Sequence, residues 1–213
     1  MKRYFCTLFD SNYLIKGLTM INSLTKHCKE FEIYVLCIDD KTKNFLEKIN
    51  ISQVKCIELY DVENESLLKA KKNRTKTEYC WTLASFFTWY LMKKFNDINQ
   101  ITYLDADLLF YSSPNKIFKE IGDSSIAIIE HRFHWITKRQ IKYGRFNVGW
   151  VTFKNDTEGN DFNVLLSARK SIKLKKIKLI EVEIIFSEKN NFTNKHFDSI
   201  YGFLKKNNYL FIG

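Results

Sequence analysis

The sequence has few of the residues that punctuate a chain or make it flexible. Among its 213 residues there are only 7 glycines and 1 proline. This scarcity excludes collagen-like repeats, low-complexity tracts and long linkers, which are rich in those two residues. The chain also has no G-x-G-x-x-G fingerprint after its first apolar run and no P-loop motif. A nicotinamide-dependent enzyme and a P-loop nucleotide hydrolase are therefore disfavoured.

The sequence also has no cysteine-pair motif, and we expect its first residues not to be a secretory leader. Five cysteines form no C-x-x-C pair, and several stand in apolar runs where cysteine behaves as a small hydrophobe. Met1–Arg3 resembles the basic start of a signal peptide, but the apolar run after it meets Asp10 too early. An odd number of cysteines in a chain without a leader argues for a reducing cytoplasm. The cysteines are Cys6, Cys28, Cys37, Cys56 and Cys80.

Apolar residues and positive charge are abundant. Hydrophobic residues make up 45% of the chain and aromatic residues 15%, which is ample for one globular domain with a core. The formal net charge is +10, and half of it lies in residues 161–213, which hold 10 Lys and Arg against 5 Asp and Glu. A basic surface attracts nucleotides, nucleic acid or anionic lipid without choosing among them. Base-composition bias toward Lys and Asn codons is an equal explanation.

Apolar runs alternate with amphipathic stretches through the first 60 residues. Runs of period-two or continuous apolar character predict strands, and apolar residues three and four positions apart predict helices. The order is strand, helix, strand, helix, strand, which is typical of a parallel sheet that binds nucleotides at the carboxyl ends of its strands. We expect one α/β domain with a mostly parallel central sheet flanked by helices. The predicted strands are Tyr4–Phe9, Phe31–Ile38 and Val54–Leu59, and the predicted helices are Tyr13–His27 and Thr42–Ile49.

A basic stretch and an apolar helix come next. Residues 61–77 are polar and carry five closely spaced Lys and Arg. Their main interpretation is a solvated loop or helix face, and the alternative is a flexible basic segment over a phosphate site. Glu78–Phe95 is apolar nearly all round, but it is too short and interrupted to span a bilayer. It predicts a core helix packed beside the central strand.

Two carboxylates follow a further apolar run. Ile101–Leu104 predicts a buried strand, and Asp105 and Asp107 come directly after it. An ionised carboxylate in an apolar setting is costly unless it is paired, so two of them at one strand end favour a cation between them. Carboxylate oxygens suit Mg²⁺ or Mn²⁺, which keep further positions open for phosphate. The alternative is a solvated turn after the strand.

Four blocks, taken together, carry a family resemblance. Their order and spacing resemble glycosyltransferases of the GT-A type that use nucleotide-diphospho-sugars. The resemblance is closest to family 8, which includes glycogenins and bacterial lipopolysaccharide galactosyltransferases. It covers about residues 3–160. The blocks are Phe9–Tyr13 leading into Asn22–Leu24, the stretch Glu78–Phe95, Tyr103–Asp107 and Phe146–Val151.

The resemblance implies roles for the metal and the donor nucleoside. Asp105 and Asp107 would act as catalytic metal ligands, joining Mn²⁺ or Mg²⁺ to the donor diphosphate. Asp10 and Tyr13 would contact uracil and ribose, the tyrosine by stacking. Tyr13 also has an ordinary interpretation as an aromatic residue at the start of a helix. No strong general base is evident in the sequence, and the stereochemistry of transfer stays open.

The resemblance also assigns residues to the sugar. Asn147, as a catalytic residue, and Gly149, as a donor-binding residue, would lie near the sugar and the acceptor. A strand bulge is the alternative for this segment, because glycine is common at bulges. His131 and His134 could suggest zinc, but the sequence offers no third ligand. We instead expect these histidines to lie in a loop that lines the sugar or acceptor site.

The last quarter of the chain departs from the family pattern. The usual third metal ligand is a histidine in a C-terminal block with Lys-Pro-Trp, but the only proline is Pro114 and the last tryptophan is Trp150. His196 is a poor substitute. We expect residues 1–160 to form the nucleotide-sugar-binding core and residues 161–213 a basic segment of the same domain. A diverged lid, a truncated product and a frameshifted end all stay open for that segment. It contains a predicted strand at Ile177–Phe186 and a predicted helix at Asp198–Lys206.

These patterns lead to one expected function and two alternatives. We expect a metal-dependent glycosyltransferase of polysaccharide biosynthesis that moves a sugar from a UDP-sugar to a saccharide or lipid-linked acceptor. It would be cytoplasmic, with peripheral contact to the anionic inner face of the membrane, and nucleic acid is not expected as a partner. A nucleotidyltransferase would usually need a glycine- and basic-rich loop where this chain has Asp10-Ser11-Asn12. The other alternative is a non-catalytic basic module that binds nucleic acid or membrane.

Overall fold

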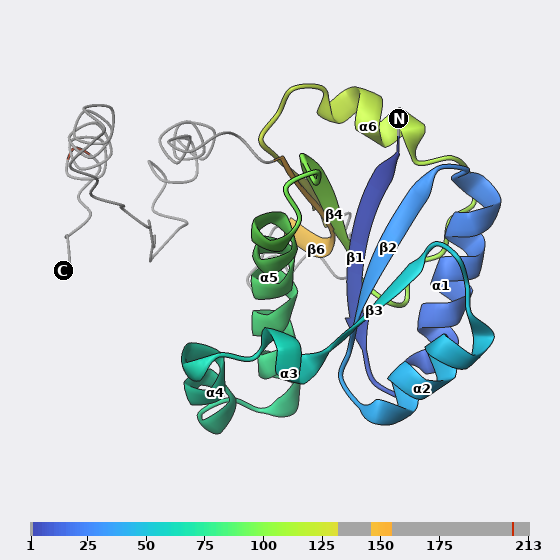
Figure 1. Cartoon of the computed structure of the whole chain (residues 1–213). Helices are drawn as coiled ribbons and strands as arrows, with labels where there is room; N and C mark the ends of the chain where they lie inside the picture. Colours follow the sequence, from blue (N-terminus) through green and yellow to red (C-terminus); the bar gives the residue numbers. More distant parts are fainter. Residues whose placement is uncertain (1, 132–145, 155–205, 207–213) are drawn as a thin grey trace, which may run out of the picture. The chain divides into compact units, whose positions relative to one another are not determined.

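A computed structural model describes residues 2–131, 146–154 and 206 of the chain (Figure 1). The chain divides into two compact units, residues 1–155 and residues 156–213. All the strands and helices given below lie in the first unit. His134, His196 and the strand predicted at 177–186 lie outside the described residues, as does the helix predicted at 198–206 except for its last residue.

A six-stranded sheet forms the centre of the first unit, in the order β3-β2-β1-β4-β6-β5. The first four of these strands run parallel to one another, whereas β6 is antiparallel to both β4 and β5. The expectation of a mostly parallel α/β sheet is therefore confirmed. The strands are β1 (Arg3–Phe9), β2 (Phe31–Cys37), β3 (Val54–Glu58), β4 (Gln100–Leu104), β5 (Ile126–Glu130) and β6 (Phe146–Lys154).

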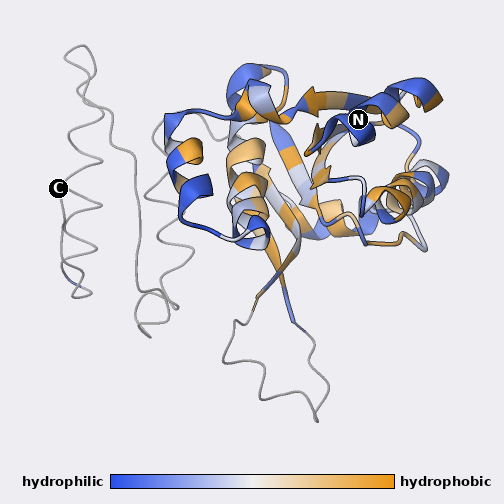
Figure 2. Cartoon of the chain, turned by 90° about the horizontal axis from the view of Figure 1, so that it is seen from below, coloured by the Kyte–Doolittle hydropathy of each residue, from blue (hydrophilic) through white to orange (hydrophobic). Residues whose placement is uncertain are grey.

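Helices cover both faces of this sheet (Figure 1). One cluster of buried residues joins α1, α2 and α6 to the sheet, and a second cluster joins α3, α4 and α5 to it. Figure 2 shows hydrophobic residues spread along the strands, whereas the helices carry both hydrophobic and hydrophilic residues. The parallel strands β1, β2 and β4 are thus mostly buried between two helical layers, as is usual for parallel strands. The helices are α1 (Leu14–His27), α2 (Asp40–Ile49), α3 (Leu59–Val62), α4 (Glu65–Lys72), α5 (Lys76–Lys94) and α6 (Asn115–Ile121).

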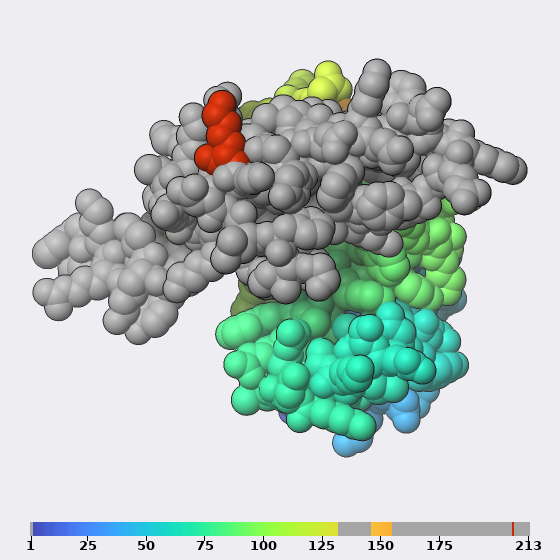
Figure 3. Space-filling model, turned by 90° about the vertical axis from the view of Figure 1, so that its left-hand side faces the viewer, coloured from blue at the N-terminus to red at the C-terminus, as the bar shows by residue number. Residues whose placement is uncertain are grey.

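The basic stretch at residues 61–77 is mostly helical, which agrees with the main interpretation of a solvated loop or helix face. The Asn64 side chain accepts a hydrogen bond from the Leu67 N–H at 2.9 Å and caps α4. α4 buries only Leu67, and it lies at the surface with α3 in Figure 3. α5 begins at Lys76, before the predicted start at Glu78, because Thr75 and Glu78 form a capping box there.

The long helix α5 packs against the sheet along one side only. Tyr79, Leu83 and Phe87 are buried in the core. Trp81 and Trp89 are 67% and 47% exposed, so the prediction of a core helix holds for one side of α5 and fails for the other. None of the helices in the described part of the chain has the length and apolar character that crossing a membrane requires.

Candidate functional site

Polar side chains gather where the parallel strands end. β1 and β4 are hydrogen-bonded neighbours, with Cys6 opposite Tyr103. Asp10 follows β1 and Asp105 follows β4, so both carboxylates belong to the carboxyl edge of the sheet. In open α/β sheets this edge is where ligands bind. The structure therefore brings the predicted nucleoside loop and the predicted metal motif to the same edge.

Asp105 is held in place by its neighbours. Its backbone N–H donates to the carbonyl oxygen of Gly149 at 2.9 Å, and its Oδ1 accepts a hydrogen bond from the Tyr103 hydroxyl at 3.1 Å. Burial raises the pKa of Asp105 above its ordinary value; the Tyr103 hydrogen bond opposes that rise and the negative charge of Asp107 adds to it. The Asp107 side chain is more exposed, and its Oδ2 lies 3.9 Å from the Lys16 Nζ. A cation between the two carboxylates would relieve their repulsion.

The segment Asn147–Gly149 lies against Asp105. A Cβ added at Gly149 would stand 3.1 Å from Asp105 Oδ2 and 3.0 Å from Asn147 Oδ1, so a side chain at this position would crowd both oxygens. The Asn147 Oδ1 also accepts the Gly149 N–H at 2.8 Å. The pairing between β5 and β6 shifts register in this segment, between Ile128 and Ile129. The strand irregularity and the approach to Asp105 therefore occur together.

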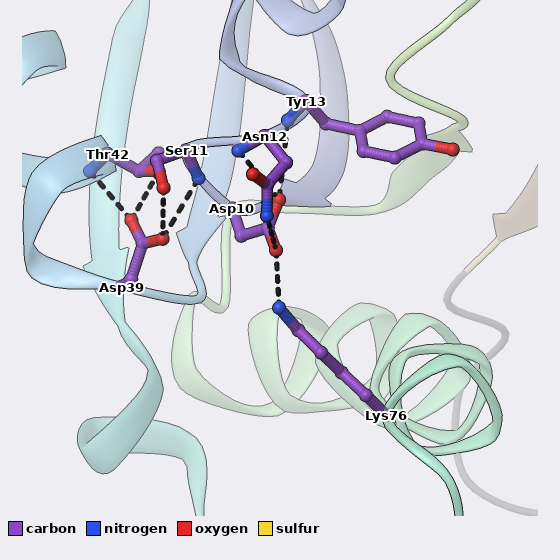
Figure 4. Close-up of polar contacts among 7 residues, drawn as sticks. All are labelled: Asp10, Ser11, Asn12, Tyr13, Asp39, Thr42 and Lys76. Carbon is purple, nitrogen blue, oxygen red and sulfur yellow. Dashed lines mark hydrogen bonds and ion pairs between the residues drawn. The ribbon is translucent and has the colours of Figure 1, made fainter.

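The loop after β1 is organised by Asp10 (Figure 4). Its Oδ1 accepts the backbone N–H groups of Asn12 and Tyr13 at 3.0 and 3.3 Å. Its Oδ2 accepts the Asn12 side-chain amide at 3.2 Å and the Lys76 ammonium, from the first turn of α5, at 2.6 Å. Burial acts to raise the pKa of Asp10, but the bonds from Lys76 and Asn12 outweigh it and lower the pKa. Asp10 thus lies at the carboxyl edge of the sheet and also holds the loop in its conformation.

Asp39 fixes the same loop from the neighbouring strand end, and sequence reasoning did not assign it a role at the site. It accepts hydrogen bonds from the Ser11 N–H at 3.0 Å and the Ser11 hydroxyl at 2.8 Å. It also caps α2 through the Thr42 N–H and hydroxyl. Burial opposes ionisation, but these bonds outweigh it and hold the pKa of Asp39 well below its ordinary value. The spacing of Asp39 and Thr42 was the available signal, since it is that of a helix cap.

Tyr13 lies at the start of α1 and is 46% exposed. Figure 4 shows that its ring points away from Asp39, Ser11 and Thr42. The Lys16 Nζ lies 4.3 Å from the centre of this ring, within the range of a cation–π contact. Lys16 therefore contacts the predicted stacking residue and also the predicted metal ligand Asp107. Nothing in the sequence pattern had singled out Lys16.

The donor set at the strand edge suits a metal that arrives with a phosphate ligand. No group of three or more His, Cys, Asp or Glu able to hold a metal occurs within residues 2–131 and 146–154. Mg²⁺ and Mn²⁺, however, are commonly held by one or two protein carboxylates together with substrate phosphates and water. Asp105 and Asp107 supply two such carboxylates, and the charge of Asp107 already helps to raise the pKa of Asp105. The residues present fit a divalent ion shared with a diphosphate.

Two hollows in the described part of the chain lie away from these residues. One, of about 610 Å³, borders the edge strand β3 and is lined by Tyr34, Cys56 and Phe95 among others. The other, of about 810 Å³, runs along α5 beside Arg74 and Trp81. Neither is lined by any of the predicted site residues. We therefore place the candidate site by its chemistry, at the carboxyl ends of β1 and β4.

Comparison with known proteins gives consistent results. The model of Glycosyl transferase family 8 matches residues 6–211, well past residue 160 where the recognised motifs end. The uncharacterised proteins YfnD and YfnF of Bacillus subtilis (strain 168) are similar. YfnD is 38% identical over 159 residues, covering 73% of this chain and 50% of YfnD. YfnF is 32% identical over 168 residues, covering 76% of this chain and 55% of YfnF. The chain thus spans about half the length of these two relatives.

Among solved structures, an active-site mutant of LgtC has a similar fold. The TM-score is 0.50 at 13% sequence identity, over 93% of this chain and 70% of LgtC. At this low identity the likeness shows the fold alone. It supports the GT-A-like architecture predicted from the sequence.

Proposed function

The chain belongs to glycosyl transferase family 8, and from this premise we propose that it transfers a sugar from a UDP-sugar to a saccharide or lipid-linked acceptor in polysaccharide biosynthesis. The observation that carries the proposal is the meeting of two predicted motifs at one sheet edge. The Asp10–Tyr13 loop ends β1, the Asp105–Asp107 pair ends the adjacent β4, and Lys16 contacts both. A nucleoside diphosphate has two parts that could be recognised at this edge. Its base would be bound by the loop, and its two charged phosphates would be bound at the aspartate pair.

In this proposal each chain segment has one task. Asp10 and Tyr13 bind uracil and ribose, and Asp105 and Asp107 hold Mn²⁺ or Mg²⁺. When bound, such an ion neutralises the charge that develops on the leaving diphosphate. Gly149 keeps the space beside Asp105 open for the sugar, and the Asn147 amide oxygen fixes the Gly149 backbone there. The proton of the acceptor hydroxyl would leave with the released diphosphate or go to water, since no residue of the chain is assigned here as a general base. The stereochemistry of transfer is left open.

We propose a cytoplasmic location for this reaction. All five cysteines lie in the described part of the chain and all are free thiols. Free buried thiols are typical of reducing compartments. The formal net charge of +10 supports peripheral contact with an anionic membrane, where a lipid-linked acceptor would be found.

The first prediction tests the metal ligand. We expect Asp107→Asn to bind UDP in the presence of Mn²⁺ no better than the wild type binds it without metal. The amide keeps the shape of the side chain and removes its charge, so the fold should be intact while a cation ligand is lost. Calorimetric titration of UDP, with and without Mn²⁺, measures the effect.

The matched control is Asp123→Asn, which removes an exposed carboxylate that pairs with Lys154 instead. It should leave metal-dependent UDP binding unchanged. Undiminished affinity in Asp107→Asn would rule out the metal assignment. Metal-independent, salt-sensitive RNA binding by the wild type, with no binding of UDP, would instead favour the basic binding module.

A further inference from the structure

We propose that Lys16 binds the diphosphate of the donor and links the nucleoside half of the site to its metal half. This inference rests on the proposed function and adds a residue to it. Lys16 lies in the first turn of α1, directly after the loop that Asp10 and Asp39 hold in place.

The Lys16 ammonium lies near both halves of the proposed site. The Lys16 Nζ lies 4.3 Å from the ring centre of Tyr13 and 3.9 Å from Oδ2 of Asp107. Tyr13 is the proposed stacking partner of the base, and Asp107 is a proposed ligand of the metal. In a nucleotide-sugar the diphosphate joins the nucleoside to the sugar, so it must run between these two positions. Lys16 stands there with a positive charge.

The ammonium is also free to change partners. The side chains of Lys16 and Asp107 are both 54% exposed, and exposed ion pairs of this kind are weak. A lysine ammonium has three donors on a flexible stem and is a common phosphate ligand. A diphosphate would offer Lys16 shorter, charge-assisted hydrogen bonds in place of one long contact.

Lys76, the other lysine at this edge, makes a different kind of contact. Its Nζ lies 2.6 Å from Oδ2 of Asp10, whose side chain is only 12% exposed. That bond joins α5 to the loop and completes the set of hydrogen bonds that Asp10 accepts. Lys76 therefore anchors the loop, and of these two lysines Lys16 is the one that is available to a ligand.

The backbone beneath Lys16 is fixed. At Gly17 an added Cβ would lie 2.5 Å from the Phe9 ring, so α1 packs directly on the last residue of β1. Phe9 is buried and its ring belongs to the core. The first turn of α1 is thus held against the end of β1. Binding of a phosphate would therefore require only the side chain of Lys16 to change position.

This arrangement predicts two separable effects. Without nucleotide, Lys16 partly neutralises Asp107 and competes there with a divalent ion. With nucleotide, the ammonium transfers to the phosphates, and Asp107 is released to the metal. Removing the ammonium should therefore weaken binding of a nucleoside diphosphate without weakening binding of the ion alone or of the nucleoside.

The test is calorimetric titration of wild type and Lys16→Met with UDP plus Mn²⁺, with uridine, and with Mn²⁺ alone. We expect Lys16→Met to bind UDP roughly tenfold more weakly, as the loss of one charge-assisted hydrogen bond requires. Uridine affinity should change by less than about threefold, and Mn²⁺ affinity should not fall. Lys16→Arg, which keeps a phosphate-binding cation, should recover most of the UDP affinity.

Lys26→Met is the matched control, since it removes an exposed lysine from the last turn of the same helix. It should bind UDP as the wild type does. If Lys16→Met binds UDP like the wild type, or loses UDP and uridine equally, the inference is overturned and the proposed function stands. If the wild type itself binds no UDP with Mn²⁺, the proposed function fails, and the inference is overturned with it.

Discussion

Asp10 and Asp39 show how single carboxylates can build a site without being its chemical centre. Asp10 uses both oxygens on the loop and on Lys76, and Asp39 uses both on Ser11 and Thr42. A carboxylate accepts about four hydrogen bonds, so both are close to saturated. A base that binds to Asp10 must therefore replace one of these donors, and the neutral side-chain amide of Asn12, at 3.2 Å, is the one most easily displaced.

A second prediction concerns Asp39 and acid stability. Its pKa is lowered from an ordinary 3.8, so its stabilising effect is complete above that pH and is lost as pH falls through the folded-state value. Asn at this position keeps one capping oxygen but loses the charge. We expect Asp39→Asn to lower the free energy of unfolding by about 1–2 kcal/mol at pH 7. The difference from the wild type should shrink below about pH 4.

Urea unfolding of both proteins between neutral and acidic pH measures this convergence. Asp40→Asn, one residue along in the first turn of α2, is the control and should show a smaller difference at every pH. A gap between Asp39→Asn and the wild type that stays constant with pH would show that the Asp39 charge contributes nothing.

At the scale of the element, the sequence predicts which helices and strands exist better than it predicts the residues at which they begin and end. Every strand and helix predicted before residue 60 is found, because apolar period and turn residues are local signals. The starts of α4 and α5 also have local sequence signals, namely the Asn64 cap and the Thr75–Glu78 capping box. These signals went unused, because the stretch was treated as one run of charged residues. α6 and β5 were not predicted. They are short, and β5 is largely exposed, so neither has a clear period.

A third prediction tests the packing of α1 on β1. Ala at position 17 would gain about 1 kcal/mol of helix propensity over Gly. Its Cβ, however, would lie 2.5–2.9 Å from three atoms of the Phe9 ring, which the core holds in place. We expect Gly17→Ala to be destabilising by about 1–3 kcal/mol, the usual cost of overpacking. Chemical denaturation gives the value.

The same variant should also disturb the site. Shifting α1 would displace Tyr13 and Lys16, so UDP affinity should fall together with stability. Thr19→Ala, at an exposed position of the same helix, should be close to neutral in both measurements. A stabilised Gly17→Ala would show that α1 can move away from β1 without cost.

At the scale of the whole molecule, topology follows from the sequence but long-range contacts do not. The alternation of strands and helices predicts the parallel sheet, and the sheet brings Asp10 and Asp105 to one edge. The contacts of Lys16 with Asp107 and of Lys76 with Asp10 join residues that are 91 and 66 positions apart. Such pairs depend on side-chain directions after folding, which no local pattern encodes. The candidate site could therefore be proposed from the sequence, but these two contacts of Lys16 and Lys76 could not.

The last prediction concerns the independence of the first unit. A fragment of residues 1–155 should fold by itself and bind UDP with Mn²⁺ about as well as the full chain. The two clusters of buried residues that pack on the sheet consist entirely of residues from this unit. Every residue that we propose to contact the donor also belongs to this unit. Its weak point is β5, where Ile126, Ile128 and Ile129 are about 40% exposed. We therefore expect cooperative thermal unfolding of the fragment at a somewhat lower midpoint, followed by circular dichroism, with calorimetry for binding. A fragment that is unfolded or aggregates would show instead that residues 156–213 are needed to complete the same core. That result would support the expectation of one domain over the whole chain.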